Sequence, residues 1–233
     1  MKCFFLFWGL MFYYCSFSQE HSDAKEYGIN GKVKQVVTYA YDSVILDKGE
    51  WIPVASAFNS RTTYFFNESG NIDSTHFLLR NKEEGRDIWR RVIYQFSNNK
   101  RSGYREYEER TLLETAVISW IDAFNYLTRV KYQDSDDITE IMNSLSPGYR
   151  DLRGEVRIFN NEGAMVYCSS YINTLEGNII SFAVSTDCMN EIQREEKFIY
   201  LTPDNNNNPL VVVALDKKSG DPKAIRVRKI EYY

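Results

Sequence analysis

The chain has 233 residues, of which 43% are hydrophobic and 15% aromatic, with 17 Tyr and 14 Phe. This length allows one large or two small domains with a sizeable core, and the aromatic content favours strands because bulky side chains fit a pleated surface. The net charge of −4 gives no electrostatic indication of binding to a nucleic-acid backbone. No nucleic-acid partner is therefore predicted.

Residues 1–18 have the pattern of a secretory signal peptide. Lys2 precedes the apolar run Cys3–Tyr14, which is too short to span a bilayer as a helix. Ser16 and Ser18 match the small-x-small rule for cleavage, so the mature chain is expected to begin near Gln19. Cleavage would leave no membrane-spanning segment and would place the protein in the periplasm or outside the cell.

Two alternatives for the leader stay open: lipidation at Cys15, which the bulky residues before it disfavour, and retention of the apolar run as an anchor. Residues 19–27 are polar and charged without a period, which predicts a mobile leader. No linker-like stretch divides residues 28–233. We therefore predict a single β-rich domain from Gly28 onwards.

The first expected strand is Gly31–Asp42, where apolar and polar residues alternate over much of the length. Lys48 and Gly49 then indicate a turn. Trp51–Ala57 is expected to be a return strand, and Pro53 within it indicates an edge or a bulge.

The stretch Tyr64–Ile72 predicts a β-hairpin. Tyr64 and Phe66 occupy alternate positions on one face of a strand, and the Asn and Gly that follow suit a tight turn. Val156–Met165 repeats the same order at the same offsets, with Phe159 as its aromatic residue. Fainter copies occur at irregular spacing, which argues against a solenoid and favours a meander of hairpins.

The order aromatic-x-aromatic-Asn-x-x-Gly-Asn-apolar resembles the tyrosine-aspartate (YD, or Rhs-type) repeat. The chain as a whole is similar to uncharacterised secreted proteins of Bacteroidetes that carry loose versions of this repeat. Tyr64–Ile72 matches the repeat well, and Phe159–Met165 matches it fairly. The resemblance implies consecutive antiparallel strands and carries no catalytic residues over.

Two segments depart from the hairpin pattern. Asp137–Ser146 is predicted to be a short helix, because its apolar residues recur at helical spacing, Asp137 and Glu140 imitate a capping box, and a Pro-Gly pair follows. Tyr104–Ala116 fits either a helix or a charged strand that continues to Ile121, and we favour the strand. The predicted fold is all-β: an antiparallel meander in a large twisted or curled sheet, with one or two short helices.

No catalytic or metal-binding constellation stands out. The two histidines, His21 and His76, lie far apart in the sequence, and no phosphate-binding or dinucleotide-binding loop occurs. Glu83–Glu84 and Glu108–Glu109 could supply the two carboxylates of a glycosidase, although the sequence does not show their separation. An acidic cluster could bind calcium, but we interpret it as a helix start; its members are Asp134, Asp136, Asp137 and Glu140. No metal and no cofactor are predicted.

Trp51, Trp89 and Trp120 are weak candidates for a binding surface, because flat rings with a polar edge stack on sugars and recur at interfaces. Packing in the core is the alternative, and Trp51 beside Pro53 is the best candidate for exposure. Cys168 and Cys188 remain after cleavage of the leader, and an oxidising compartment would favour a disulfide between them. The alternative is that Cys168 is a small apolar core residue and that both thiols stay reduced.

These observations predict a secreted or periplasmic, non-enzymatic scaffold or binding module of the bacterial cell envelope. Its partner would be a protein or a glycan that the sequence does not identify. The alternative is a hydrolase that cleaves a glycan or a peptide with carboxylate side chains.

Overall fold

The structure is a computed structural model that describes residues 21–81, 85–177 and 179–233. The predicted signal peptide lies outside the described residues. The barrel strands are β1 (Val33–Tyr41), β4 (Phe58–Phe66), β5 (Ile72–Asn81), β6 (Arg86–Ser97), β7 (Lys100–Glu108), β8 (Thr111–Trp120), β9 (Asn125–Tyr132), β10 (Ile138–Leu145), β11 (Asp151–Phe159), β12 (Met165–Glu176), β13 (Ile179–Asp187), β14 (Ile192–Pro203), β15 (Pro209–Asp216) and β16 (Pro222–Tyr232).

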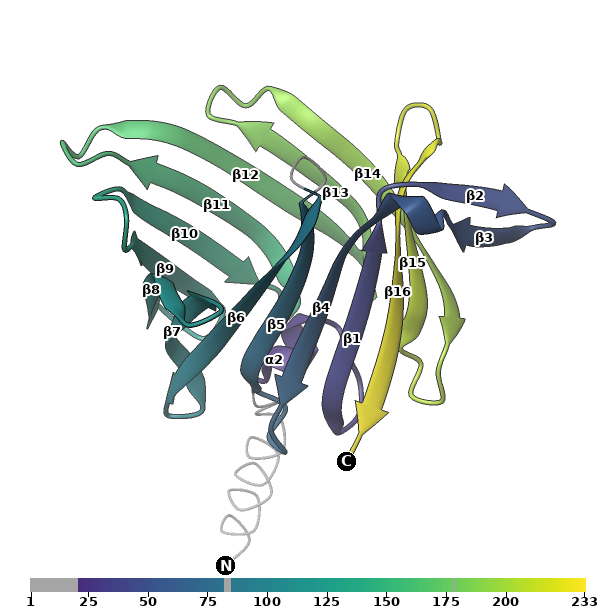
Figure 1. Ribbon diagram of the computed structural model, residues 1–233, viewed down its shortest axis with the longest axis horizontal. Helices are drawn as coiled ribbons and strands as arrows, with labels where there is room; N and C mark the ends of the chain where they lie inside the picture. The colour runs from purple at the N-terminus through teal and green to yellow at the C-terminus, as the bar shows by residue number, and fades with distance from the viewer. Residues whose placement is uncertain (1–20, 82–84, 178) are drawn as a thin grey trace, which may run out of the picture.

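These fourteen strands form a closed antiparallel barrel (Figure 1). From β4 to β16, each strand pairs with the next one along the chain. β1 closes the barrel because it pairs with β4 on one side and with β16 on the other. The prediction of an all-β meander of consecutive hairpins in a curled sheet is confirmed, and closure removes the two free edges that an open sheet would expose.

The two hairpins that defined the repeat have the expected register. Phe66 ends β4 and Phe159 ends β11. Gly70 and Gly163 lie in the following turns with φ of 80° and 78°, a left-handed conformation that costs glycine little. In both turns the asparagine after the Phe accepts two backbone N–H groups through its side-chain oxygen. The turn chemistry is therefore the same in both copies.

The prediction of a helix over Asp137–Ser146 is wrong, because residues 138–145 form β10. Its neighbour β11 pairs with it along its whole length, and β9 pairs with residues 138–144. Thr139 is buried whereas Ile138 is 45% exposed, as expected for alternating faces. The backbone hydrogen bonds to the strands on both sides outweigh a weak helical preference. The backbone N–H of Asp137 donates to Ser135 Oγ at 3.0 Å, so Asp137 does not start a helix.

The strand interpretation of Tyr104–Ala116 holds, but two strands share the segment. β7 ends at Glu108 and β8 begins at Thr111. Glu109 adopts a φ of 52° in the turn between them. The segment is therefore a hairpin and not one continuous strand.

The expectation of a mobile leader over residues 19–27 is wrong for the part that the structure describes. Asp23–Glu26 form the short helix α2, with Ser22 as its N-cap. Asp23 is fully buried, and Ala24 is 4% exposed within a core cluster that also contains Val36, Phe66 and Ile72. Figure 1 shows α2 inside the lower end of the barrel. None of the described helices is long and apolar enough to cross a bilayer.

A small hairpin packs outside the barrel. It consists of β2 (Val44–Asp47) and β3 (Glu50–Pro53), followed by the 3-10 turn η1 (Ala55–Ala57). Val44 from this hairpin contacts Val213 and Ile225 of β15 and β16, both of which are fully buried. The hairpin therefore covers an apolar part of the outer wall that water would otherwise contact.

Candidate functional site

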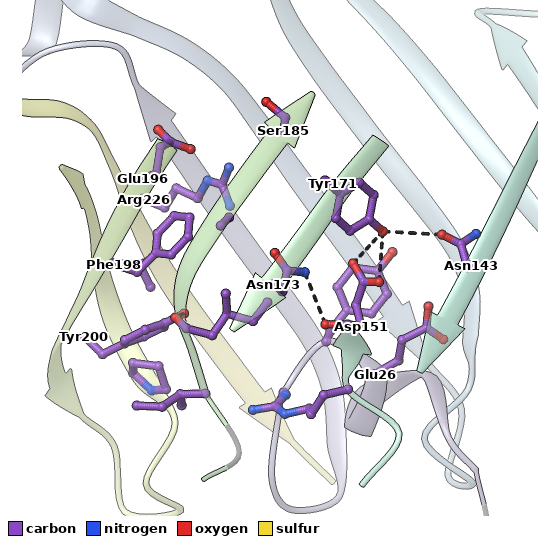
Figure 2. Close-up of a pocket in the computed structure, with 18 of the residues that line it drawn as sticks. Glu26, Asn143, Asp151, Tyr171, Asn173, Ser185, Glu196, Phe198, Tyr200 and Arg226 are labelled. Atoms are coloured by element: carbon purple, nitrogen blue, oxygen red, sulfur yellow. Dashed lines mark hydrogen bonds between the residues drawn. The ribbon is translucent and has the colours of Figure 1, made fainter. Parts of the chain in front are cut away.

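The barrel encloses a cavity of about 720 Å³ (Figure 2). A barrel of about eight strands has an interior that side chains just fill, so fourteen strands leave open space. The lining combines polar and apolar side chains in equal measure, and its charged residues are five arginines and three carboxyl groups: Arg101, Arg150, Arg194, Arg226, Arg228, Glu26, Asp151 and Glu196. Helix α2 supplies Glu26 and forms the floor.

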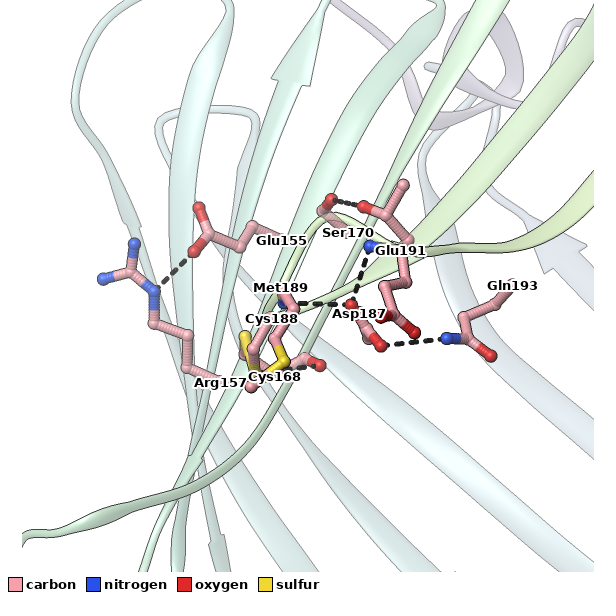
Figure 3. Close-up of a disulfide and its surroundings, with 10 residues drawn as sticks. Glu155, Arg157, Cys168, Ser170, Asp187, Cys188, Met189, Glu191 and Gln193 are labelled. Carbon is pink, nitrogen blue, oxygen red and sulfur yellow. Dashed lines mark hydrogen bonds and ion pairs between the residues drawn. A yellow bond between two sulfur atoms is a disulfide. The ribbon is translucent and has the colours of Figure 1, made fainter.

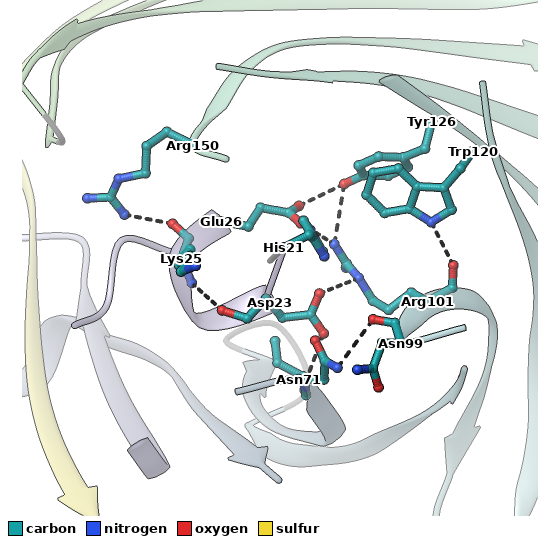
Figure 4. A network of polar contacts seen from close by, with 12 residues as sticks. His21, Asp23, Lys25, Glu26, Asn71, Asn99, Arg101, Trp120, Tyr126 and Arg150 are labelled. Atoms are coloured by element: carbon teal, nitrogen blue, oxygen red, sulfur yellow. Dashed lines mark hydrogen bonds and ion pairs between the residues drawn. The ribbon is translucent and has the colours of Figure 1, made fainter. Parts of the chain in front are cut away.

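The floor is held by a buried ionic network (Figure 4). Arg101 of β7 forms ion pairs with Asp23, at 2.8 Å, and with Glu26. The Tyr126 hydroxyl donates to Glu26 at 2.7 Å. Burial alone would raise the pKa of Glu26, but the charge of Arg101 and the hydrogen bonds from His21 and Tyr126 outweigh it and lower this pKa to about 2.

Hydrogen bonds from the backbone and from side chains fix α2 to two turns of the barrel. The N–H of Ala24 donates to the carbonyl of Gly70 at 2.9 Å, and the N–H of Ile72 donates to Asp23 Oδ2 at 2.8 Å. On the opposite side, Arg150 donates to the carbonyl of Lys25 at 3.1 Å. The helix is therefore part of the barrel floor and has its own hydrogen bonds on both sides.

His21, Asp23 and Glu26 have ligand atoms within 4.8 Å of one another, which is a metal-like arrangement. Arg101 already places its guanidinium group against both carboxylates. A second cation there would meet the charge of Arg101 at close range. These residues therefore fit an ion-pair network better than a metal site.

One wall of the cavity is acidic and rich in hydrogen bonds. The Tyr171 hydroxyl lies 2.8 and 2.9 Å from the two carboxyl oxygens of Asp151. Asn173 donates to the Asp151 carbonyl at 3.2 Å, and Asn143 lies 3.4 Å from the Tyr171 hydroxyl. Burial raises the pKa of Asp151 to about 6, with the hydrogen bond from Tyr171 opposing this shift.

The opposite wall is basic. Arg226 and Arg228 alternate along β16 with residues on the outer face, so both line the cavity. Tyr200 of β14 lies beside them and donates to the carbonyl of Ile180 at 2.7 Å. Nearer the solvent, Arg194 forms an ion pair with Glu196 at 2.5 Å. The Arg194 side chain is 60% exposed, so the cavity is open to water at this side.

The three tryptophans named from the sequence lie in three different environments. Trp51 is half-buried against the cluster under the β2–β3 hairpin. Trp89 is 50% exposed on the outer wall, with the Arg61 guanidinium 5.2 Å from its ring. Trp120 packs beside the floor and donates to the Arg101 carbonyl at 2.9 Å. The structure does not bring them together into one surface.

A disulfide joins Cys168 of β12 to Cys188, which follows β13 (Figure 3). The Cα atoms are 5.2 Å apart, within the range that a bridge requires. Ser169 and Asp187 are opposite each other at the end of the β12–β13 ladder. Cys188 is therefore one residue past the last pair and lies beside Cys168 on the neighbouring strand.

The acidic pairs named from the sequence do not form a site in the described residues. Glu83 and Glu84 lie outside the described residues. Glu108 accepts from Arg90 at 3.3 Å, and Glu109 occupies the β7–β8 turn. The residues that line the cavity were not identified from the sequence, although Arg226 and Arg228 alternate with Val227 and Lys229 in the closing strand. That period of two was the available signal for an arginine-bearing face.

No family model matches the chain, and no curated protein matches it significantly. A porin-like protein from Bacteroides vulgatus ATCC 8482 is similar in structure, with a TM-score of 0.51 and 9% identity over 88% of this chain and 99% of that chain. A porin-like protein from Bacteroides uniformis ATCC 8492 has a TM-score of 0.47 at 9% identity over 85% and 98%. A LolA superfamily protein from Nitrosomonas europaea has a TM-score of 0.27 at 8% identity over 92% and 94%. The first likeness shows a shared barrel fold and nothing about function, and the other two carry no argument.

Proposed function

We propose that the protein is a non-enzymatic binding module of the bacterial cell envelope that holds a small polar ligand inside its barrel. The observation that carries the proposal is the cavity of about 720 Å³, a size typical of small-molecule sites. Its polar groups come from several strands and from α2, so the fold holds them in fixed positions. A barrel that served only as a scaffold would have no need for this internal polar surface.

We further propose that the barrel works in water and not within a lipid bilayer. A membrane barrel presents an apolar band to lipid, and a charge in the middle of that band is costly. Here the outer wall carries ion pairs within its strands, between Arg129 and Glu140 at 2.8 Å and between Arg157 and Glu155 at 2.6 Å. These pairs suit a periplasmic or secreted protein.

A carboxylate-dependent hydrolase is the weaker alternative. One observation favours it: Glu26 with a pKa of about 2 and Asp151 with a pKa of about 6 line the same cavity, as in acid-base pairs. However, Arg101, Tyr126 and His21 bind both oxygens of Glu26, and Tyr171 binds Asp151. Neither carboxyl group is free to attack a substrate, so the geometry supports binding better.

The test is a binding screen with the purified full chain. Neutral sugars, sugar acids and amino acids are added at high concentration while the melting temperature is measured, since a ligand at a hundred times its Kd stabilises a protein by about 2.7 kcal/mol. Ser185→Trp places a large ring in the cavity, because Ser185 lines it. Ser170→Trp is the matched control. Tyr171 is opposite Ser185 in the ladder, and Ser170 is the residue before Tyr171, so the Ser170 side chain faces outwards.

We expect at least one compound to stabilise the wild type and the Ser170→Trp variant but not the Ser185→Trp variant. Equal stabilisation of both variants would place binding outside the cavity and contradict the proposal. Cleavage of a glycan or peptide that is lost in the Asp151→Asn variant would support the hydrolase instead.

A further inference from the structure

We infer that the cavity selects an organic oxyanion, a carboxylate or a phosphate or sulfate ester carried on a small ring, and that Arg226 and Arg228 form its anion subsite. This inference rests on the proposed binding function and specifies the ligand class. It follows from the charge environment of these two arginines, from the donors and rings around them, and from the contrast with the outer wall.

Arg226 and Arg228 have no carboxylate partner among the described residues. On β1, the residue opposite Arg226 is Ala40 and the residue opposite Arg228 is Thr38. On β15, Val212 is opposite Arg226. By contrast, Arg129 and Arg157 on the outer wall each form an ion pair with a glutamate. Arg228 is half-buried, whereas Arg226 is exposed to the water of the cavity. An unpaired guanidinium group that is partly withdrawn from water is costly, so the natural partner of Arg228 is an anion from solution, which Arg226 can reach as well.

The positive charge of the cavity opposes the charge of the whole chain. Five arginines and three carboxyl groups line it, which is a formal charge of +2, or +1 when Asp23, the buried partner of Arg101, is included, whereas the whole chain carries −4. Burial lowers the pKa of Arg228, and the nearby charge of Arg226 lowers it further, because two cations repel each other. A bound oxyanion would remove this repulsion, and the planar guanidinium group can bind two oxygens at once.

The neighbours of the subsite suit a ring that carries the anion. Phe198 and Tyr200 are on the same face of β14 and line the cavity next to the basic wall (Figure 2). Burial raises the pKa of Tyr200, and the charges of Arg228, Arg150 and Arg226 act against this shift, so this phenol shares the electrostatic environment of the basic wall. A ligand could therefore place its charge on the arginines and its ring on the aromatic side chains.

The experiment is a calorimetric titration of the full chain with glucose, glucuronate, glucose 6-phosphate, glucose 6-sulfate, inorganic phosphate and inorganic sulfate. We expect at least one of the three sugar anions to bind at least tenfold more tightly than glucose and than the inorganic ions, and to bind less tightly as salt is added. The sugar anion that binds most tightly identifies the oxyanion group. Equal binding of glucose and all three sugar anions would overturn the inference.

The double variant Arg226→Gln/Arg228→Gln should weaken binding of the sugar anion roughly ten- to hundredfold, because hydrogen bonds to charged groups contribute about 1.5 to 3 kcal/mol. Lys229→Gln is the matched control, since Lys229 lies on the same strand but faces outwards, over the ring of Tyr39. It should bind as the wild type does. Unchanged affinity in the double variant would overturn the inference.

The folding of each variant is checked by its melting temperature. Removing two unpaired like charges should leave this temperature unchanged or raise it, and the single variant Arg226→Gln, whose side chain is at an exposed position, repeats the test if the double variant does not fold. The inference would fail alone if the protein bound neutral ligands as tightly as anions and Ser185→Trp abolished this binding. The proposed function would then remain supported. If nothing in either screen binds, both fail.

Discussion

Asp151 is the residue whose charge state the barrel changes near neutral pH. Its folded pKa is about 6, above the ordinary value of 3.8, so the folded state binds this proton more tightly than the unfolded state does. The resulting stability is fully present below about pH 4 and is lost as the pH rises through about 6. An ionised Asp151 therefore destabilises the fold at pH 7.

The first prediction is that Asp151→Asn raises the free energy of unfolding at pH 7 to 8 by about 1 to 3 kcal/mol, with no gain at pH 4. The asparagine oxygen still accepts from Tyr171, so the gain comes from the lost charge. Urea unfolding at both pH values measures it. Asp134→Asn, in an exposed loop, is the control and should change stability little at either pH. Equal effects of Asp151→Asn at pH 4 and pH 8 would contradict this account.

Arg101 has the opposite role, since its buried charge holds two carboxylates. Its side chain is 8% exposed, and those of Asp23 and Glu26 are 0% and 9% exposed. The second prediction is that Arg101→Ala lowers the free energy of unfolding by about 3 to 5 kcal/mol, because it leaves buried acids unpaired. Arg129→Ala removes an exposed pair and should cost less than about 1 kcal/mol. Similar losses in the two variants, measured by urea unfolding, would refute the assigned role of Arg101.

At the scale of elements, the disulfide ties the first part of β12 to the turn between β13 and β14. The third prediction is that the denatured, non-reduced protein has no thiol at Cys168 or Cys188 that reacts with a labelling reagent. Two reactive thiols per mature chain would reject the bridge. The bridge spans 20 residues, so Cys168→Ser/Cys188→Ser should lower the free energy of unfolding by roughly 3 kcal/mol. The single variants test the pairing, because each should leave one reactive thiol.

Considered as a whole molecule, the barrel has charges on both its inner and its outer face. The fourth prediction is that the purified protein stays in the supernatant when it is sedimented with neutral phospholipid vesicles, at low and at high salt. The reason is the cost of bringing Arg129, Glu140, Glu155 and Arg157 into hydrocarbon. Insertion that resists extraction at alkaline pH would contradict the proposal that the barrel works in water.

The mature end of the chain gives a fifth prediction. Mass spectrometry of the exported protein should find an unlipidated N-terminus near Gln19. A lipid on Cys15 would instead attach the barrel to a membrane surface. The signal sequence and its cleavage stay predictions because they concern residues 1–18.

Local interactions made part of the fold readable from the sequence. The hairpins at Phe66 and Phe159 follow from turn chemistry between residues a few positions apart: an asparagine side chain accepts N–H groups of its own turn, and a glycine adopts positive φ. The recurrence of such hairpins at irregular spacing then predicts an antiparallel meander. These features need no knowledge of distant residues, and the structure has them where the sequence placed them.

The tertiary structure decided what depends on residues far apart in the chain. Pairing of β1 with β16 closes the barrel. Only closure defines an interior, in which Arg226 and Arg228 face the acidic wall from β11 and β12 across the cavity. Pairing on both sides made residues 138–145 a strand despite their helical spacing. Arg101, which is 75 residues away from Glu26 in the chain, pairs with it and fixes the polar leader as the barrel floor. In each case a contact between distant segments supplied free energy that outweighed the local preference, and no pattern within a single segment encodes such a contact.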